Sequence, residues 1–462
     1  MDDVSGLDLT KYSTIIVGSG PAGATLSRFL EARGEACLIL ETGTEQYDDK
    51  IQRSFSTVDC RGHYGNGHWN THWVRALGGT SMIWGGWCQT LDQRDFADWP
   101  ISADALKPHY QVAAKALGRD DIITTYREPH ATGFVFKPFS LTYTPTRFGE
   151  VQTDILKSGG KIDIALSTSV CGLVPNASRS RVDAIKLSQN GGPPVTLQLS
   201  QNQRLILAAG AMGNTQLMLT PPEGETIGVG NESDMVGRCL MEHPHIAGVA
   251  KIVAKAGQIG IPQPPKTFGE YMPALIPNDE VYEAAGGLGV TLSLVDEQRN
   301  YEDPTERFLL AQYGADAELY SIYLRAEMSP ETHNRVELTY GEDPSGLPRL
   351  KAMCAVSTTN HIVYRNVLER LGEQLIETGI GRLAINNETL FRTVHGGGHT
   401  MGTTRMGNDP KSSVVDANCR VHGYGNLFVA GSSVFTTGGA SNPTMTIVAL
   451  ASRLADFLTE TV

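Results

Sequence analysis

Three glycines and one acidic residue near the start of the chain have the spacing of a phosphate-binding turn. Gly18, Gly20 and Gly23 form the pattern G-x-G-x-x-G, and Glu41 follows 18 residues after the last glycine. The first glycine permits a tight turn, the second lets a pyrophosphate approach the backbone, and the third lets a helix and a strand pack closely. A carboxylate placed like that of Glu41 can accept hydrogen bonds from ribose hydroxyls. The pattern predicts dinucleotide binding; the alternative is an ordinary tight turn between a strand and a helix.

A segment rich in histidine and glycine near the other end of the chain holds the candidate acid–base groups. It spans residues 394–402 and contains His395 and His399. A neutral imidazole is the natural general base near neutral pH. Asn442 and Pro443 have the residue types of a helix N-cap and a first helical position, so we expect the positive end of a helix beside them. Either histidine could instead be a structural core residue.

Two further histidines, His68 and His72, are four residues apart, a spacing that could place two metal ligands on one face of a helix. The neighbouring Gly62, Gly65 and Gly67 argue against a helix there. We therefore expect a loop packed over the cofactor and no metal. The seven cysteines are scattered and lack C-x-x-C spacing, which favours reduced thiols in a cytoplasmic protein over a disulfide framework or a zinc site.

The elements around the glycine turn are those of a parallel nucleotide-binding sheet. Residues 14–17 and 36–40 are apolar runs typical of buried strands, and residues 24–33 between them are helix-like. Residues 204–210 form another buried run that ends in glycine, and a helix is expected from Asn214. The order strand, turn, helix, strand is what the dinucleotide interpretation requires.

Beyond residue 245 the pattern changes to short strands separated by Pro- and Gly-rich turns. The candidate strands are residues 248–253, 289–295, 319–328 and 335–340, and an amphipathic helix is expected at residues 361–378. Such spacing is typical of an antiparallel sheet and not of further βαβ units. Before residue 245, strands are also expected at residues 161–174, 182–187 and 195–199, and a helix at residues 107–118.

The composition is that of a water-soluble globular protein. The 462 residues are 40% hydrophobic and 19% charged, and the net charge is −12. An acidic balance of this size argues against a nucleic-acid-binding surface. No apolar run approaches 18 residues and the first residues lack the apolar core of a signal peptide, so we expect neither a membrane span nor a leader.

Several blocks of sequence resemble, in order, those of the glucose–methanol–choline (GMC) flavoprotein oxidoreductases. They are the glycine fingerprint, the R-A-L-G-G-T-S block at residues 75–81, and residues 95–100, 207–212, 236–244 and 399–458. The C-terminal sequence resembles most the sugar-oxidising branch of this family: pyranose oxidases, the flavin subunits of fructose and gluconate dehydrogenases, and aminoglycoside-modifying dehydrogenases. The resemblance implies an α/β fold, with a Rossmann-like FAD-binding domain and a substrate domain with a mainly antiparallel sheet, as in the GMC and p-hydroxybenzoate-hydroxylase architecture.

The resemblance implies a domain order and a cofactor. Residues 1–245 would form the first part of the FAD-binding domain, with 119–150 as a lid or insertion, residues 246–390 the substrate domain, and residues 391–462 the C-terminal part of the FAD-binding domain. The implied FAD-contacting residues are Gly18, Gly20, Pro21, Ala22, Gly23, Glu41, Thr42, Arg75, Gly78, Gly79, Thr80, Met82, Trp84, Gly85, Val170, Ala209, Gly210, Asn214, Gly431, Ser432, Asn442, Thr444 and Met445.

The flavin is expected to be bound without a covalent link. Some relatives attach it to a histidine shortly after the Gly-Gly pair, and that position is Ile83 here. His72, in Thr71-His72-Trp73, resembles the linking tripeptide but precedes the glycines. A covalent link at His72 is the alternative.

The family's catalytic motif places the reacting groups at the C-terminal end. His399 matches the base of the H-x-x-G-T motif, and Asn442 matches its partner. The imidazole would take the proton of an alcohol while hydride passes to flavin N5, and the amide could donate a hydrogen bond to the same oxygen. His395, the rival base, is displaced by four residues from the motif. His243 and His245 are expected to be packing or cofactor-shell residues.

The resemblance therefore implies an FAD-dependent oxidoreductase that oxidises a hydroxyl of a sugar-like or glycoside substrate, including aminoglycosides. The alternative among enzymes is a GMC oxidase of a hydrophobic alcohol such as a sterol. The alternative among non-enzymes is a nucleotide-binding interaction module without catalysis. The electron acceptor could be oxygen, a quinone or a protein, so oxidase and dehydrogenase both stay open, as does the oligomeric state.

Overall fold

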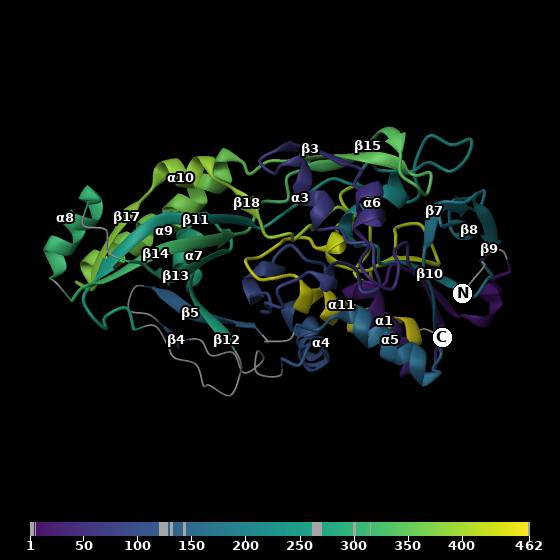
Figure 1. The fold of residues 1–462 in the computed structure, drawn as a ribbon, viewed down its shortest axis with the longest axis horizontal. Coiled ribbons are helices and arrows are strands. Elements are labelled where there is room, and N and C mark those ends of the chain that lie inside the picture. Colours follow the sequence, from purple (N-terminus) through teal and green to yellow (C-terminus); the bar gives the residue numbers. More distant parts are fainter. Residues whose placement is uncertain are drawn as a thin grey trace.

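The computed structural model describes residues 4, 6–119, 128–129, 133–141, 145–260, 270–298, 302–314 and 316–460. It contains a five-stranded parallel sheet and an eight-stranded antiparallel sheet, which lie at opposite ends of the molecule (Figure 1). This combination confirms the predicted α/β fold class with an antiparallel substrate-domain sheet.

The parallel sheet is built from both ends of the chain. Its strand order is β19-β10-β1-β2-β6. The strands are β1 (Thr14–Val17), β2 (Cys37–Leu40), β6 (Ile162–Ala165), β10 (Arg204–Leu207) and β19 (Leu427–Val429). Every residue of β1 and β2 is buried, which is why these strands read as unbroken apolar runs. The carboxyl ends of β1, β10 and β19 lie at the same edge of the sheet, since the strands are parallel.

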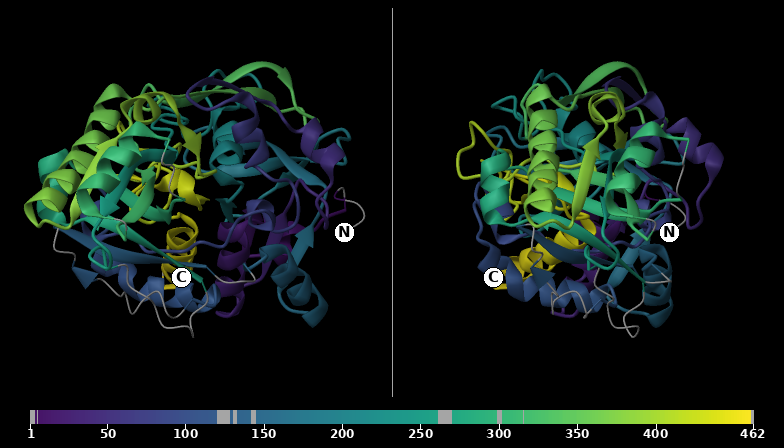
Figure 2. Two further views of the ribbon diagram at one scale, coloured as in Figure 1. Left: turned by 60° about the vertical axis from the view of Figure 1, so that its left-hand side comes forward. Right: turned by 90° about the vertical axis from the view of Figure 1, so that its left-hand side faces the viewer.

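Helices from both chain ends pack beside this sheet. They are α1 (Pro21–Glu31), α4 (Ala103–Ala116), α5 (Phe148–Ser158), α6 (Gly210–Leu219) and α11 (Thr444–Glu460). Helix α11 packs against both α1 and α4. Figure 2 shows the C-terminal segment in yellow between the N-terminal region and the green substrate region.

The antiparallel sheet has the order β17-β11-β14-β13-β12-β5-β4, and β18 also pairs with β11. Its strands are β4 (Glu128–Pro129), β5 (Phe134–Leu141), β11 (Pro244–Ala254), β12 (Glu270–Pro277), β13 (Val290–Asp296), β14 (Glu318–Ala326), β17 (Gly381–Ile385) and β18 (His395–Gly396). Helices α7 (Asp279–Ala285), α8 (Pro304–Tyr313), α9 (Thr358–Glu377) and α10 (Asn387–Arg392) accompany it. The buried side chains of α9, among them Tyr364, Leu368 and Leu371, belong to the same core as the sheet.

Two smaller sheets complete the fold. One contains β7 (Thr168–Pro175), β8 (Val182–Gln189) and β9 (Val195–Gln198), and the other contains β15 (Arg335–Glu342), β16 (Pro348–Cys354) and β3 (Val58–Gly62). The short helices α2 (Asp49–Ser54) and α3 (Asn66–Thr71) flank β3 in the sequence.

Several boundaries differ from the sequence predictions. The run 161–174 is two strands, because Ser167 between them has a left-handed backbone (φ 51°). Strand β15 pairs with β16 and, through β16, lies beside β3, and it does not join the large sheet. Helix α6 begins at Gly210 and not at Asn214. In the segment 119–150, β5 pairs with β12 of the large sheet, whereas residues 120–127, 130–132 and 142–144 lie outside the described residues.

The prediction against a helix around His68 was wrong. Residues Asn66–Thr71 form α3, and Gly65 serves as its N-cap with an extended backbone. The glycines therefore precede or begin a short helix and do not break it. No helix among the described residues is long and apolar enough to cross a membrane.

Candidate active site

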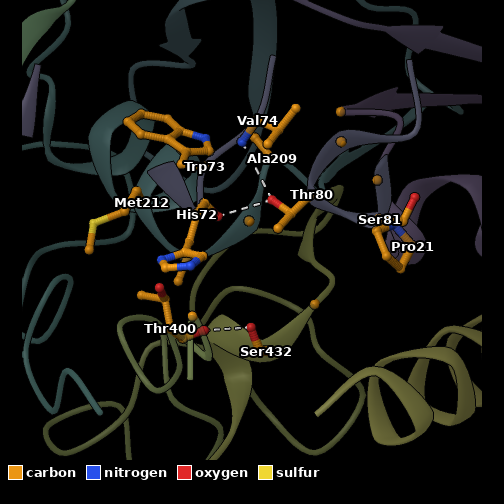
Figure 3. A pocket seen from close by; sticks show the side chains of 18 of the residues that line it. Pro21, His72, Trp73, Val74, Thr80, Ser81, Ala209, Met212, Thr400 and Ser432 are labelled. Atoms are coloured by element: carbon orange, nitrogen blue, oxygen red, sulfur yellow. Dashed lines mark hydrogen bonds between the residues drawn. The ribbon is translucent and has the colours of Figure 1, made fainter. Parts of the chain in front are cut away.

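A cavity of about 600 Å³ lies where the carboxyl edge of the parallel sheet meets the antiparallel sheet. The β1–α1 turn, residues 72–87, residues 397–400 and the N-terminus of α11 all contribute to its lining. Figure 3 shows one part of it, where the His72 ring lies between Trp73 and Thr400. The hydroxyl of Thr80 donates to the His72 carbonyl at 3.0 Å, and that of Ser432 donates to the Thr400 carbonyl at 2.6 Å.

Most of the residues predicted to contact the cofactor line this one cavity. They are Gly18, Gly20, Pro21, Ala22, Glu41, Thr42, Arg75, Gly79, Thr80, Trp84, Gly85, Val170, Ala209, Gly210, Gly431, Ser432, Asn442 and Thr444. The sequence separations among them are large, so the fold and not the local motif brings them together.

Five of the predicted cofactor residues do not line the cavity. Gly23 lies against the Gly18 carbonyl, and Gly78 against the backbone of Gly149. Asn214 accepts a hydrogen bond from the Ala209 backbone at 2.9 Å and so supports the β10–α6 turn. The remaining two are Met82 and the fully buried Met445.

The turn between β1 and α1 leaves space at only one of its three fingerprint glycines. A Cβ atom on Gly18 would lie 2.6 Å from the Ala208 carbonyl oxygen, and one on Gly23 would lie 2.1 Å from the Gly18 oxygen. A Cβ on Gly20 would meet only the Cα of Gly79, at 4.0 Å. The first and third glycines are thus required for packing, whereas the second borders the open cavity.

Glu41 lies at the end of β2 with its carboxylate buried. Oε2 accepts from the backbone N–H and the hydroxyl of Ser19, and Oε1 accepts from the Gly43 N–H at 2.7 Å. Burial raises the pKa of Glu41, although the hydrogen bonds from Ser19 and Gly43 oppose that shift. Oε1 retains a second acceptor position, and Glu41 lines the cavity.

His399 and Asn442 meet in the cavity although 43 residues separate them in the sequence. Nδ2 of Asn442 lies 3.3 Å from Nε2 of His399. The amide nitrogen can only donate, so Nε2 must carry the lone pair. Asn442 lies directly before Pro443, whose carbonyl accepts the N–H of Ile447 in the first turn of α11. The pair therefore lies at the positive end of that helix.

The neighbouring histidine supports the same tautomer. Nε2 of His243 lies 3.3 Å from the Gly438 carbonyl, to which it must donate, and Nδ1 of His243 lies 2.8 Å from Nδ1 of His399. A neutral His243 that donates from Nε2 accepts at Nδ1, so His399 must donate from its own Nδ1. Nε2 of His399 is then unprotonated, which agrees with the contact to Asn442.

Backbone pairing holds these two histidines together. Residues 241–245 run antiparallel to residues 395–401: Met241 pairs with Met401, and His245 pairs with His395. The buried Glu242 carboxylate also accepts from the backbone N–H groups of His243 and His399, each at 2.8 Å. Its other oxygen lies 2.6 Å from Nε2 of His68. Burial opposes ionisation of Glu242, but the hydrogen bond and charge of His68 outweigh it and lower its pKa to about 2.

The histidines that surround the pair are held neutral. Burial lowers the pKa of His399 well below its ordinary value, and the adjacent His243 adds to the effect. Burial is also the main reason that the pKa of His243 is lowered and that of His245 falls to about 3. A neutral imidazole can accept a proton, so the base is ready for use well below neutral pH.

The other predicted histidine candidates lie elsewhere. His395 is exposed on β18 and does not line the cavity. His68 and His72 do share α3 and its C-cap, with ring centroids 4.7 Å apart. Their nitrogens bond the Glu242 carboxylate and the His68 carbonyl respectively, and no group of metal-ligating side chains occurs among the described residues.

The antiparallel sheet supplies cavity residues that sequence reasoning missed. These are Met272, Tyr323 and Arg325, together with His245, which was expected only in a packing or shell role. The Tyr323 hydroxyl lies 2.8 Å from Nδ1 of His245. Strand β14 alternates buried Ile322 and Leu324 with these polar residues. That alternation is visible in the sequence, but nothing in it indicates that the polar face borders a cavity.

Comparisons with known proteins agree on one family. Residues 330–451 match the family described as GMC oxidoreductase. The chain is 23% identical to 2-methyl-1,2-propanediol dehydrogenase of Mycolicibacterium austroafricanum, over 96% of this chain and 94% of that protein. It is 25% identical to 6'''-hydroxyparomomycin C oxidase of Streptomyces lividus, over 96% of this chain and 90% of that protein. Residues 330–451 are therefore those of a GMC oxidoreductase.

A comparison with solved structures shows the same fold. The crystal structure of pyridoxine 4-oxidase from Mesorbium loti superposes with a TM-score of 0.60 at 18% identity, covering 96% of this chain and 98% of that one. GMC oxidoreductases act on CH–OH groups, and the family implies FAD. The cavity fits such a cofactor, because Gly20 leaves open the space that a side chain would fill and Glu41 lies beside it with a free acceptor position.

Proposed function

We propose that this GMC oxidoreductase oxidises a hydroxyl of a polar, sugar-like substrate to a carbonyl. The observation that carries the proposal is the pair His399 and Asn442, which meets at 3.3 Å in the same cavity as the β1–α1 turn. An imidazole lone pair and an amide N–H that converge on one point can both address a single hydroxyl oxygen. That arrangement suits the oxidation of an alcohol.

FAD, when bound, supplies the acceptor for two electrons. Nε2 of His399 takes the hydroxyl proton as the substrate C–H bond breaks and its electron pair leaves as hydride. The C–O bond becomes the carbonyl, so one proton is held on His399 and two electrons leave the substrate. Asn442 donates a hydrogen bond to the reacting oxygen but cannot take its proton. A substrate oxygen between the two groups would replace their long direct contact.

One carboxylate near His399 favours the protonated base that this step produces. The Glu242 carboxylate accepts from the His399 backbone and raises the pKa of His399, against the larger effects of burial and His243. The N-terminus of α11 favours negative charge on the reacting oxygen beside Asn442.

We further propose that FAD is held without a covalent bond. Ile83, at the position of the family's linking histidine, borders the cavity and has no group that could form such a bond. His72 also borders the cavity; its Nδ1 lies 2.8 Å from the His68 carbonyl and donates to it, so the alternative link could form only at Nε2. Non-covalent binding relies on the backbone of the β1–α1 turn and on Glu41.

A polar substrate is supported by the substrate-side lining. Tyr323, His245 and Arg325 present a hydroxyl, an imidazole and a guanidinium to the cavity. A sterol would offer no hydrogen-bond partner to Nε2 of His245 or Nε of Arg325, which are buried and unpartnered, at a free-energy cost of about 1–3 kcal/mol for each. The lining therefore supports a polyol or sugar-like alcohol over a hydrophobic one.

Replacing His399 with Ala tests the assignment of the base. We expect the purified variant to stay yellow while anaerobic flavin reduction by a good alcohol substrate slows by about two to four orders of magnitude. Stopped-flow absorbance of the flavin measures the rate. His395→Ala is the matched control and should reduce at the wild-type rate, because His395 lies outside the cavity. Wild-type reduction by His399→Ala would place the base elsewhere.

A further inference from the structure

Arg325 is a buried cation in the wall of the reaction cavity. It lies on β14, is 6% exposed and borders the cavity. Its register partners are His245 on β11 and Thr291 on β13. The residue therefore occupies the interior of the sheet, where its long side chain cannot extend into bulk water.

The contacts of Arg325 leave its charge unbalanced. One terminal nitrogen, Nη2, donates to the Ser293 hydroxyl at 3.1 Å, and the guanidinium carbon lies 4.5 Å from the centroid of the Phe139 ring. Its Nε is buried without a hydrogen-bond partner. Within the described part of the chain, no carboxylate forms an ion pair with it. Burying a charge without a partner costs free energy, and a bound anionic ligand would offset that cost.

The other arginine in the cavity wall provides a contrast. Arg75 is equally buried, but Asp343 and Glu41 counteract the effect of burial, which lowers its pKa to about 9. For Arg325 burial lowers the pKa to about 10, and Tyr323 is the only group that opposes the shift. Arg75 lies in the company of Glu41 and so belongs to the nucleotide end of the cavity. Arg325 lies with the substrate-side residues.

Arg325 is close to the proposed base. The ring centroids of His245 and His399 are 5.9 Å apart, and His245 is the register partner of Arg325. Tyr323, two residues before Arg325 on the same face of β14, contacts His245. A small molecule whose hydroxyl reaches His399 therefore has its remaining groups near Arg325.

We propose that Arg325 binds a carboxylate of the substrate, so that the alcohol oxidised here is a hydroxy acid, for example a sugar acid. The proposal rests on the proposed function and specifies its substrate class. A planar guanidinium with free donors is the group best suited to a carboxylate. Among the described lining residues Arg325 is the sole arginine or lysine at this end. One positive charge matches a carboxylate, whereas a phosphate dianion would leave excess negative charge.

Matched substrate pairs test this proposal on the holoenzyme. D-gluconate and D-gluconamide differ only in charge at one end, and so do 4-hydroxybutyrate and its amide. D-glucitol 6-phosphate tests whether the site prefers a phosphate to a carboxylate. We expect wild-type kcat/KM for flavin reduction to be about 100-fold higher for at least one acid than for its amide, mainly through KM. Equal values for acids and amides, or a preference for the phosphate, would overturn the carboxylate assignment.

Three variants locate the effect. Arg325→Met should abolish the preference for the acid, and Arg325→Lys should restore part of it, because the charge returns without the planar fork. Arg238→Met removes a surface arginine that pairs with Asp234, and it should retain the full preference. If Arg325→Met instead lowers kcat equally for acids and amides, the arginine acts on the reacting groups and not on a substrate carboxylate.

Two measurements do not depend on turnover. Benzoate and acetate should perturb the flavin spectrum of wild-type and His399→Ala holoenzyme but not that of Arg325→Met at equal ionic strength. A persistent effect in Arg325→Met would contradict the proposal. The melting temperature of Arg325→Met should be unchanged or higher, because the variant no longer buries an unpaired charge. A marked destabilisation would indicate a structural role. Failure of the proposed function is separate, since it would appear as normal reduction by His399→Ala.

Discussion

His243 fixes which nitrogen of His399 can act as a base. It donates to the Gly438 carbonyl and accepts from His399, so its own neutral tautomer determines that of its neighbour. The role is one of positioning, because His243 does not line the cavity. Such a group can be removed without loss of the base itself, which makes its contribution measurable.

Replacement of His243 with Leu should slow flavin reduction by about tenfold or more, since His399 then divides between two tautomers. His243 contributes to the lowered pKa of His399, so in this variant that pKa should rise toward its ordinary value. The acid limb of the pH–rate profile should consequently move to higher pH. His243→Gln, whose carbonyl oxygen can accept from Nδ1, should recover part of the rate. An unchanged acid limb in His243→Leu would exclude this role.

At this scale the sequence identified the residues that belong to continuous motifs. The motif around His399 and the N-cap signal at Asn442 predicted a pair that the fold brings together. Tyr323 and Arg325 could not be found, because they sit in an ordinary amphipathic strand. Whether these residues line a cavity depends on what lies next to the strand, and only the tertiary structure shows this.

The β1–α1 turn combines two kinds of glycine within six residues. Gly18 and Gly23 are enclosed by backbone atoms, whereas Gly20 faces open space. The motif therefore separates into positions that the fold requires and one that the ligand requires. That distinction leads to a comparison of two variants in one turn.

Gly20→Val should fold but lose FAD, because its side chain occupies the space in which a pyrophosphate would approach the backbone. Gly23→Val should not yield folded protein, since its Cβ would lie 2.1 Å from the Gly18 oxygen. Circular dichroism reports folding, and acid precipitation of each purified protein reports the flavin. Wild-type flavin should appear in the supernatant if it is not covalently bound. A fully yellow Gly20→Val protein would place the pyrophosphate elsewhere.

The order of elements was predictable where local patterns are strong. Strands β1 and β2, helix α9 and three strands of the large sheet, β11, β13 and β14, lie close to their expected bounds. The pairing of β16 with β3 was not predictable, because β3 lies more than 250 residues earlier in the chain. Helix α3 was missed because its glycines lie at and just after the N-cap.

Buried ionisable groups couple the stability of the whole molecule to pH. The pKa of His245 falls to about 3 in the folded protein, mainly through burial. The unfolded chain therefore binds more protons than the folded one between about pH 6.5 and pH 3. The contribution of His245 is fully present above pH 6.5 and is lost as the pH falls. Burial raises the pKa of Asp95 to about 7, so the contribution of Asp95 to stability is lost as the pH rises and not as it falls. The contribution of His245 is therefore best measured by comparing a variant with the wild-type protein.

We expect the free energy of unfolding of His245→Gln to improve relative to wild type as the pH falls from 6.5 to about 4. The limiting change is about 1.4 kcal/mol for each pH unit, because the variant has no imidazole to protonate. Urea titrations of both proteins at pH 7, 5.5 and 4 measure the difference. A difference that is constant across this range would show that His245 titrates alike in both states.

Strand β19 brings the last part of the chain to the edge of a sheet whose other strands precede residue 208. Synthesis proceeds from the N-terminus. The backbone groups of β10 that pair with β19 therefore have no strand partner until residues 427–429 have been made. Asn442 and the first turn of α11 are made later still. We therefore expect a nascent chain arrested before residue 427 to carry the fingerprint turn without Asn442, and so to be unable to oxidise an alcohol.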